Sequence, residues 1–338
     1  MDRGKIAIIA CESGKPFANK ILHYLNQKEK IENKMLLTSS EERHFDNTEI
    51  KTEIGESIRG EDVYIVQDVE NSITNLSVDQ NLRALTTAID AAHRSDANYV
   101  TAIIPVFPYG RQDKALSREG ITAARVAQEI EDAGANRIIT LDIHAEAIAG
   151  FFRKAKFENL RASKSLIPYI RDNIGLENLV ISSADTGGAS RANFYASRLK
   201  LPLNIIYKVK NYNKPEGEQV ERVELLGNVE GKRVFVIDDM IDKATTARPV
   251  ILKLREKGAI EVYFACSLAL FNGPAIERLS KLYDDRLLNG VIGTDAVYHG
   301  GKEFLDKHIW YKEPTVADYH SDVIYNINQG FSISKLLD

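Results

Sequence analysis

The chain has 338 residues, of which 44% are hydrophobic and 27% charged, a balance typical of a globular protein with two ordinary domains. Its 44 basic and 48 acidic residues give a net charge of −4, which offers no electrostatic case for nucleic acid or a membrane surface. No apolar run approaches the roughly 20 residues of a membrane span. The two cysteines, Cys11 and Cys266, lack metal-ligand spacing and suit a reducing compartment, so we expect a cytoplasmic protein.

The first half of the chain alternates strand-like and helix-like segments. Apolar runs predict strands at 5–10, 63–66, 99–104 and 137–141, and apolar residues at helical spacing predict helices at 16–25, 77–96 and 122–133. Residues 26–62 are polar, with only short extended pieces. Strands separated by helices favour right-handed crossovers and a parallel sheet.

The same alternation returns in the second half, after a boundary near residue 155. Strands are expected at 178–182, 203–207, 233–237 and 261–268, with helices after Gly188 and from Ala247 to a stop at Gly258. The polar, proline-containing stretch 211–220 predicts a flap or hairpin loop, and a helix and short closing segment are expected from Thr315 onward. The two halves therefore predict similar-sized α/β units.

The stretch 233–246, RVFVIDDMIDKATT, begins with an apolar run and then carries several aspartates. Its apolar start predicts a strand buried on both faces that ends in Asp238 and Asp239, followed by Asp242, a short loop and a helix. Ligands of open α/β sheets collect at the carboxyl ends of strands, beside helix N-termini. The pattern suits a polyol phosphate, with or without a divalent metal, although the two acids could instead merely cap a surface turn.

A set of ordered motifs resembles the ribose-phosphate pyrophosphokinase (PRPP synthetase) family, and the similarity extends over nearly the whole chain. The motifs are GESIRGEDVYIVQ, FPYGRQD, LDIHAEAIAGFF, SSADTGGASRA, FNGPAIERL and INQGFSISKLL. The resemblance implies an α/β fold of two tandem phosphoribosyltransferase-like domains, each a mostly parallel sheet flanked by helices. The domains would span 1–155 and 156–315, and a tail at 316–338 would pack back on the first.

The implied reaction transfers the diphosphoryl group of MgATP to ribose 5-phosphate, which gives PRPP and AMP. Mg²⁺ is the implied cofactor, with His144 and Asp185 as metal residues, and Lys208, Lys210 and His144 are the implied catalytic residues. Residues that match the family's ATP site are Phe45, Asn47, Glu49, Arg111, Gln112, Lys114 and Arg118. Residues that match its ribose-phosphate loop are Asp238, Asp239, Asp242, Lys243, Ala244, Thr245 and Thr246.

The segment around Phe45 matches one that a neighbouring subunit contributes to the family's ATP site. The resemblance therefore implies a homo-oligomer built from dimers, with a hexamer as one option. Taken alone, Phe45 would be interpreted as ordinary core packing and His144 as a satisfied core histidine.

The chain departs from the family pattern in three places. Lys210 stands where the family has an arginine, the loop between RQD and the SR pair is about one residue shorter, and Lys243 and Thr245 replace a threonine and a glycine. A residue other than glycine at 245 costs little at negative φ and roughly 1 kcal/mol or more at positive φ. The departures keep an alternative open: a catalytically weak or inactive paralogue that acts as a regulatory or scaffold nucleotide-binding subunit. A phosphoribosyltransferase is a further alternative, against which RQD and LDIHAEAIAGFF argue.

Overall fold

The structure is a computed structural model that describes residues 3–28, 34–210 and 220–337. It divides into two compact units. The first comprises Met1–Arg161, Asp295–Gly300 and Val316–Asp338, and the second comprises Ala162–Thr294 and Gly301–Thr315. The expected boundary at residue 155 falls just before a strand that pairs with the preceding strand of the first unit, so that unit extends to residue 161.

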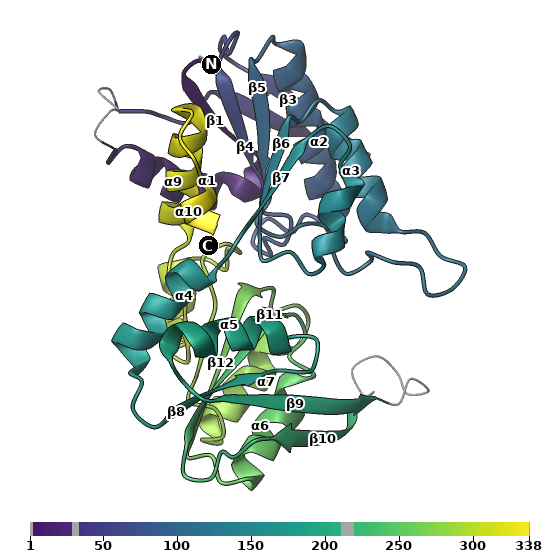
Figure 1. Cartoon of the computed structure of the whole chain (residues 1–338). Coiled ribbons are helices and arrows are strands. Elements are labelled where there is room, and N and C mark those ends of the chain that lie inside the picture. Colours follow the sequence, from purple (N-terminus) through teal and green to yellow (C-terminus); the bar gives the residue numbers. More distant parts are fainter. Residues whose placement is uncertain (1–2, 29–33, 211–219, 338) are drawn as a thin grey trace. The chain divides into compact units, whose positions relative to one another are not determined.

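A parallel sheet forms the core of the first unit. Its strand order is β1 (Ile6–Ala10), β4 (Asp62–Val66), β5 (Tyr99–Ile103), β6 (Arg137–Leu141) and β7 (Lys156–Leu160). The central strands β4 and β5 are mostly apolar and, apart from the partly exposed Tyr99, are buried on both faces. Helices α1 (Lys15–Leu25) and α9 (Ala317–Asn328) lie on one side of the sheet, and α2 (Val78–Arg94) and α3 (Thr122–Asp132) on the other (Figure 1).

Local signals explain where these helices begin and how the C-terminal segment is held. Helix α2 starts with a capping box, in which Ser77 and Gln80 each satisfy the other's backbone N–H. Helix α9 packs against α1, where the ring of His320 meets the edge of Phe17 at 5.0 Å between centroids. Short elements complete the unit: η1 (Glu12–Gly14), η2 (Glu146–Phe151) and α10 (Ser334–Leu337).

An antiparallel hairpin, β2 (Ser40–His44) and β3 (Ile50–Ile54), stands apart from the parallel sheet of the first unit. It falls in the stretch 26–62, for which only short extended pieces are predicted. Strand β3 packs against α2. No residue of β2 and only Ile50 of β3 is buried, which explains the lack of an apolar run in the sequence.

The second unit also has a mostly parallel sheet. Its order is β10 (Val220–Leu226), β9 (Leu203–Lys210), β8 (Leu179–Ser183), β11 (Arg233–Ile241), β12 (Glu261–Ala269), β13 (Gly290–Ile292) and β14 (Tyr311–Lys312). Only the β9–β10 pair is antiparallel among these neighbours. The helical elements are α4 (Ser163–Tyr169), η3 (Ile170–Ile174), α5 (Ala189–Leu199), α6 (Ala247–Glu256), α7 (Ala275–Asp284) and α8 (Lys302–Lys307).

Two strands are longer than predicted. Strand β11 does not end at Ile237 but continues to Ile241, because Met240 and Ile241 still pair with β12. Strand β9 continues past Tyr207 to Lys210 because β10 pairs with it along that length. The predicted loop at 211–220 lies outside the described residues except for Val220. None of the helices in the described part of the chain is both long and apolar enough to cross a membrane.

Candidate active site

The order of strands in the second unit marks where a ligand would bind. From β8 the chain passes through α5 to β9 on one side, and from β11 it passes through α6 to β12 on the other. Right-handed crossovers in opposite directions place α5 and α6 on opposite faces of the sheet (Figure 1). The carboxyl ends of β8 and β11 therefore form a topological switch point, the usual ligand site of an open α/β sheet.

The strand register brings four predicted site residues to this switch point. Ile237 of β11 pairs with Ser183, the last residue of β8, so Asp238 and Asp239 follow in β11 where Asp185 follows in the turn after β8. Asn204 of β9 pairs with Ser182 near the end of β8, and β9 continues beyond that end to Lys208. Because β8 ends at Ser183 while β11 continues, Asp238 and Asp239 lose their neighbour strand on that side.

The charges at the switch point are arranged in close pairs. Lys208 Nζ lies 3.8 Å from Asp185 Oδ2, and only 4% of the Lys208 side chain is exposed. Arg191 Nη1 lies 3.9 Å from Asp239 Oδ1. Burial raises the pKa of Asp238 well above its ordinary value and the Asp239 carboxylate raises it further, whereas Lys208 opposes the rise. The group thus combines a buried ammonium, at Lys208, and a partly buried guanidinium, at Arg191, with acids that repel one another.

Asp185 is fixed by the turn between β8 and α5. Its Oδ1 accepts the N–H of Gly188 at 3.0 Å, and its Oδ2 faces Lys208. A Cβ added at Gly187 would lie 3.3 Å from Asp185 Oδ1, so this turn is tight around the carboxylate. Arg191 follows in the first turn of α5; sequence reasoning missed it, although the quoted motif SSADTGGASRA contains it.

The loop 242–246 connects β11 to the start of α6. Ala244 is buried and has a φ of +53°, whereas Thr245 is not among the positive-φ residues, so its replacement of a glycine carries no left-handed strain. Lys243 is exposed and its carbonyl oxygen accepts a hydrogen bond from Arg278 at 2.8 Å. Thr246 is the N-cap of α6, but its hydroxyl does not cap the helix.

Lys210 is the last residue of β9, and its side chain lies outside the described residues. Its neighbour two positions earlier, Lys208, is described and points to the acid group named above.

In the first unit, His144 follows the end of β6. Asp142 begins this turn with a φ of +43° and is buried, and Arg161 Nη1 lies 3.7 Å from its Oδ1. His144 itself is exposed, so it is not a satisfied core histidine. It belongs to the first unit and Asp185 to the second.

The residues predicted for the ATP side lie on two exposed segments of the first unit. Arg111, Gln112, Lys114 and Arg118 are all exposed, in the loop that leads to α3. Gln112 Oε1 accepts the hydroxyl of Thr122 at 2.6 Å and its carbonyl accepts the N–H of Ala123 at 3.2 Å, which ties this loop to the first turn of α3.

Phe45, Asn47 and Glu49 form the turn of the β2–β3 hairpin. The Phe45 side chain is 50% exposed, so the core-packing interpretation of this residue is wrong. The N–H of Phe45 donates to the carbonyl of Glu49 at 2.9 Å, and Asn47 Oδ1 accepts the N–H of Glu49 at 3.2 Å.

The described residues do not gather three His, Cys, Asp or Glu side chains into a metal cluster. Mg²⁺, however, typically takes only one or two carboxylates and keeps water and phosphate oxygens as its other ligands. Asp185 and the acids of β11 are oxygen donors of the type that Mg²⁺ prefers, and their mutual repulsion favours a nearby cation.

Comparison with known proteins gives the family. The model of the N-terminal domain of ribose phosphate pyrophosphokinase matches residues 6–134, and the phosphoribosyl transferase domain model matches residues 156–296. A ribose-phosphate pyrophosphokinase from Listeria innocua is 38% identical over 303 residues, which are 89% of this chain and 90% of that protein. One from Aquifex aeolicus is 34% identical over 98% of both chains.

A solved structure gives the same result. The crystal structure of phosphoribosylpyrophosphate synthetase from Mycobacterium smegmatis is similar, with a TM-score of 0.83 and 29% identity, over 96% of this chain and 99% of that one. The predicted fold class, two mostly parallel α/β sheets flanked by helices, is confirmed. The chain belongs to the ribose-phosphate pyrophosphokinase family.

Proposed function

We propose that this protein is a ribose-phosphate diphosphokinase, which transfers the diphosphoryl group of MgATP to ribose 5-phosphate and releases AMP. The observation that carries the proposal is the match, over 98% of both chains, to ribose-phosphate pyrophosphokinases such as that of Aquifex aeolicus. The group of charges at the switch point supports it, since diphosphoryl transfer depends mostly on positioning and neutralising charge.

The second unit supplies the ribose 5-phosphate site. Asp238 and Asp239, at the open side of β11, accept hydrogen bonds from the sugar hydroxyls, and Arg191 holds Asp239 in place. The 5-phosphate binds at the loop 242–246, beside the positive end of α6. The exposed cation of Lys243 adds charge there in place of the family's hydroxyl.

Lys208 is the proposed catalytic cation. Its ammonium is shielded from solvent and held beside Asp185, so it is positioned before the substrates bind and can stabilise charge on the transferring group. Lys210 is the second proposed catalytic cation; a lysine there keeps the charge of the family's arginine but not its planar fork.

The residues fit Mg²⁺ as the cofactor. Asp185 is the proposed ligand in the second unit and His144 the proposed contact in the first. When bound, the metal neutralises charge on the substrate phosphates, which provide most of its ligands.

The first unit supplies the nucleotide site. Arg111 and Gln112 bind ATP, with Lys114 and Arg118 on the loop that follows, and all four are accessible to a ligand. Phe45, Asn47 and Glu49 complete an ATP site through the hairpin turn. The family match further suggests a homo-oligomer, built from dimers, in which this turn serves a neighbouring subunit.

The alternative of an inactive paralogue loses one of its supports. Backbone strain at Thr245 was one reason to expect a damaged phosphate loop, and Thr245 has no positive φ.

AMP release from MgATP and ribose 5-phosphate tests the proposal. Wild-type protein should release AMP only when both substrates are present, and Lys208→Ala should lower kcat by roughly 10²–10³-fold. Wild-type release no faster than that of Lys208→Ala would exclude the enzyme and favour the paralogue.

A further inference from the structure

The β2–β3 hairpin carries three proposed ATP residues, yet it forms its own two-stranded sheet. An isolated two-stranded hairpin is at best marginally stable in water. The position of its turn therefore depends on the contacts that join the hairpin to the body of the first unit.

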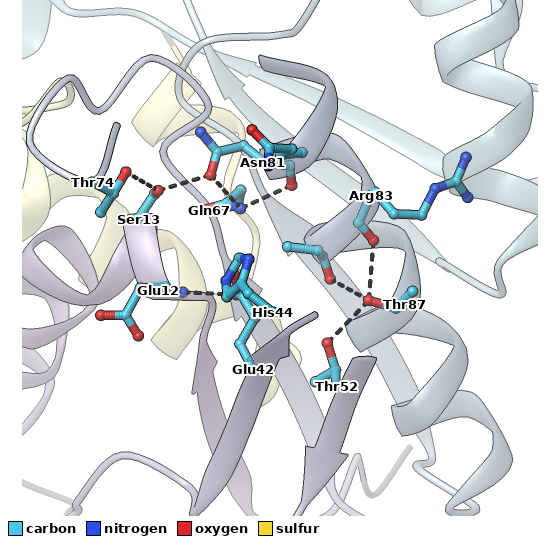
Figure 2. A network of polar contacts seen from close by, with 12 residues as sticks. Glu12, Ser13, Glu42, His44, Thr52, Gln67, Thr74, Asn81, Arg83 and Thr87 are labelled. Atoms are coloured by element: carbon cyan, nitrogen blue, oxygen red, sulfur yellow. Dashed lines mark hydrogen bonds and ion pairs between the residues drawn. The ribbon is translucent and has the colours of Figure 1, made fainter. Parts of the chain in front are cut away.

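Glu42 of β2 makes the contact with the start of α1. Its Oε2 accepts the backbone N–H of Glu12 at 2.9 Å, and its Oε1 lies 2.8 Å from His44 Nε2 (Figure 2). Glu12 opens η1, which runs directly into α1, so the carboxylate meets the positive end of a helix.

The orientation of Glu42 distinguishes it from its neighbours in the strand. Its side chain is 5% exposed, whereas the side chains of Glu41 and Arg43 are 60% and 49% exposed and pair with each other. A strand places successive side chains on opposite faces, so Glu42 faces the body of the unit while Glu41 faces solvent.

The second strand is joined to α2 by a hydroxyl pair. Thr52 Oγ1 and Thr87 Oγ1 lie 3.0 Å apart (Figure 2). Thr87 donates its own proton to backbone carbonyls of α2, at Arg83 and Ala84, so Thr52 is the donor of the pair. Each strand of the hairpin thus has its own polar contact with the body.

The turn between the strands is fixed by its own hydrogen bonds. The N–H of Phe45 donates to Glu49 and the N–H of Thr48 donates back to Phe45, at 2.9 and 2.8 Å, while Asn47 Oδ1 accepts from Glu49. The turn therefore moves with the strands, and Glu42 lies only three residues before Phe45.

We propose that Glu42 is a positioning residue for ATP: by fastening β2 to the start of α1, it holds the turn 45–49 where ATP requires it, without touching ATP. This inference rests on the proposed function. When the carboxylate is lost, the turn is displaced in the substrate complex and in the transition state alike. Such a loss of uniform binding raises KM and leaves kcat nearly unchanged.

The test compares Glu42→Ala and Glu42→Gln with a matched control, Glu41→Ala, which removes the same charge from the exposed face of the same strand. Glu42→Ala should raise the KM for ATP about tenfold, with kcat and the KM for ribose 5-phosphate little changed. Glu42→Gln should recover part of the loss, because its amide oxygen can still accept the Glu12 N–H. Glu41→Ala should behave as wild type.

Binding of α,β-methylene ATP separates this inference from the proposed function, since the analogue binds without being cleaved. Calorimetry should show about tenfold weaker binding in Glu42→Ala than in wild type or Glu41→Ala, and hydrogen exchange over residues 40–54 should be faster in Glu42→Ala than in either. Equal affinity in Glu42→Ala and wild type, or equal weakening in Glu41→Ala, overturns the inference. A wild-type protein that binds the analogue but releases no AMP overturns the proposed function instead.

Discussion

Two buried titratable groups of the first unit should oppose each other in the pH dependence of its stability. Burial lowers the pKa of His320 from 6.5 to about 4; its Nδ1 lies 2.7 Å from the Val316 carbonyl and its Nε2 has no hydrogen-bond partner. Burial raises the pKa of Asp68 from 3.8 to about 7, against the N–H groups of Tyr298 and Glu70 that donate to it.

The sign of each effect on stability depends on whether the folded or the unfolded state binds more protons. The folded state resists protonation of His320, so the stability that depends on its neutral ring is lost as the pH falls from 6.5 towards 4. The folded state retains the proton of Asp68, so that stability is lost as the pH rises from 3.8 through 7. At about 1.4 kcal/mol per pH unit, His320 changes the free energy of unfolding by about 3 kcal/mol and Asp68 by about 4 kcal/mol. Because the two changes have opposite signs, they nearly cancel between pH 4 and 6.5.

Removing one of the two groups should reveal the pH dependence of stability that the other contributes. The free energy of unfolding of His320→Leu should fall by about 3 kcal/mol, relative to wild type, as the pH rises from 4 to 7, and that of Asp68→Asn should rise by about 4 kcal/mol. Urea unfolding followed by circular dichroism, which reports both units, should contain this change. Fluorescence of Trp310, the single tryptophan, reports the second unit and should show no such change. If the difference in unfolding free energy between each variant and wild type does not change with pH, the reasoning is refuted.

Three further predictions concern the proposed site. Thr245→Gly should destabilise the second unit by roughly 0.5–1 kcal/mol, because glycine adds chain entropy where no positive φ is relieved; urea unfolding followed by Trp310 fluorescence measures this, and a stabilised variant would contradict the observed backbone. Lys243→Thr should raise the KM for ribose 5-phosphate several-fold, on the scale of one charge-assisted hydrogen bond, and leave that for ATP unchanged; an unchanged KM for ribose 5-phosphate would remove Lys243 from the site. Mixing Phe45→Ala with Lys208→Ala subunits under exchange conditions should restore up to about a quarter of wild-type activity if the ATP site is shared between subunits; no gain on mixing would argue against a shared site.

The sequence predicted most strands of both sheets because they are apolar and buried on both faces, which leaves a clear signal. It could not predict where β11 ends. Asp238 to Ile241 are two acids followed by two apolar residues, and their pairing with β12 keeps them in the strand. The consequence is functional, since the two acids lose their neighbour strand on one side where β8 ends, while their own strand continues.

The hairpin shows why some of the site escapes sequence reasoning. The strand SEERH has no apolar residue, so neither periodicity nor β-propensity predicts it. Its inward residue is a glutamate whose partner, the Glu12 N–H, lies 30 residues earlier in the chain. Resemblance proposed Phe45, Asn47 and Glu49, but only the folded chain brings Glu42 to the N–H of Glu12.

At the switch point, the sequence motifs identified the residues, whereas the order and pairing of the strands determine which of them lie close together. The pairing of Lys208 with Asp185 depends on strands β8 and β9 being neighbours, a long-range fact that no local pattern contains. Arg191 was missed because an arginine in the first turn of a helix is usually an exposed residue; its proximity to Asp239 depends on the packing of α5 against β11.

The fate of the β-phosphate of ATP tests the central claim most directly. With ATP labelled at the β-phosphorus, the account predicts that the label leaves the nucleotide and appears on the ribose 5-phosphate product, together with unlabelled AMP. It further predicts that Lys208→Ala slows this transfer by roughly 10²–10³-fold. Label that remains in the nucleotide, as ATP or as ADP, would contradict diphosphoryl transfer by this protein.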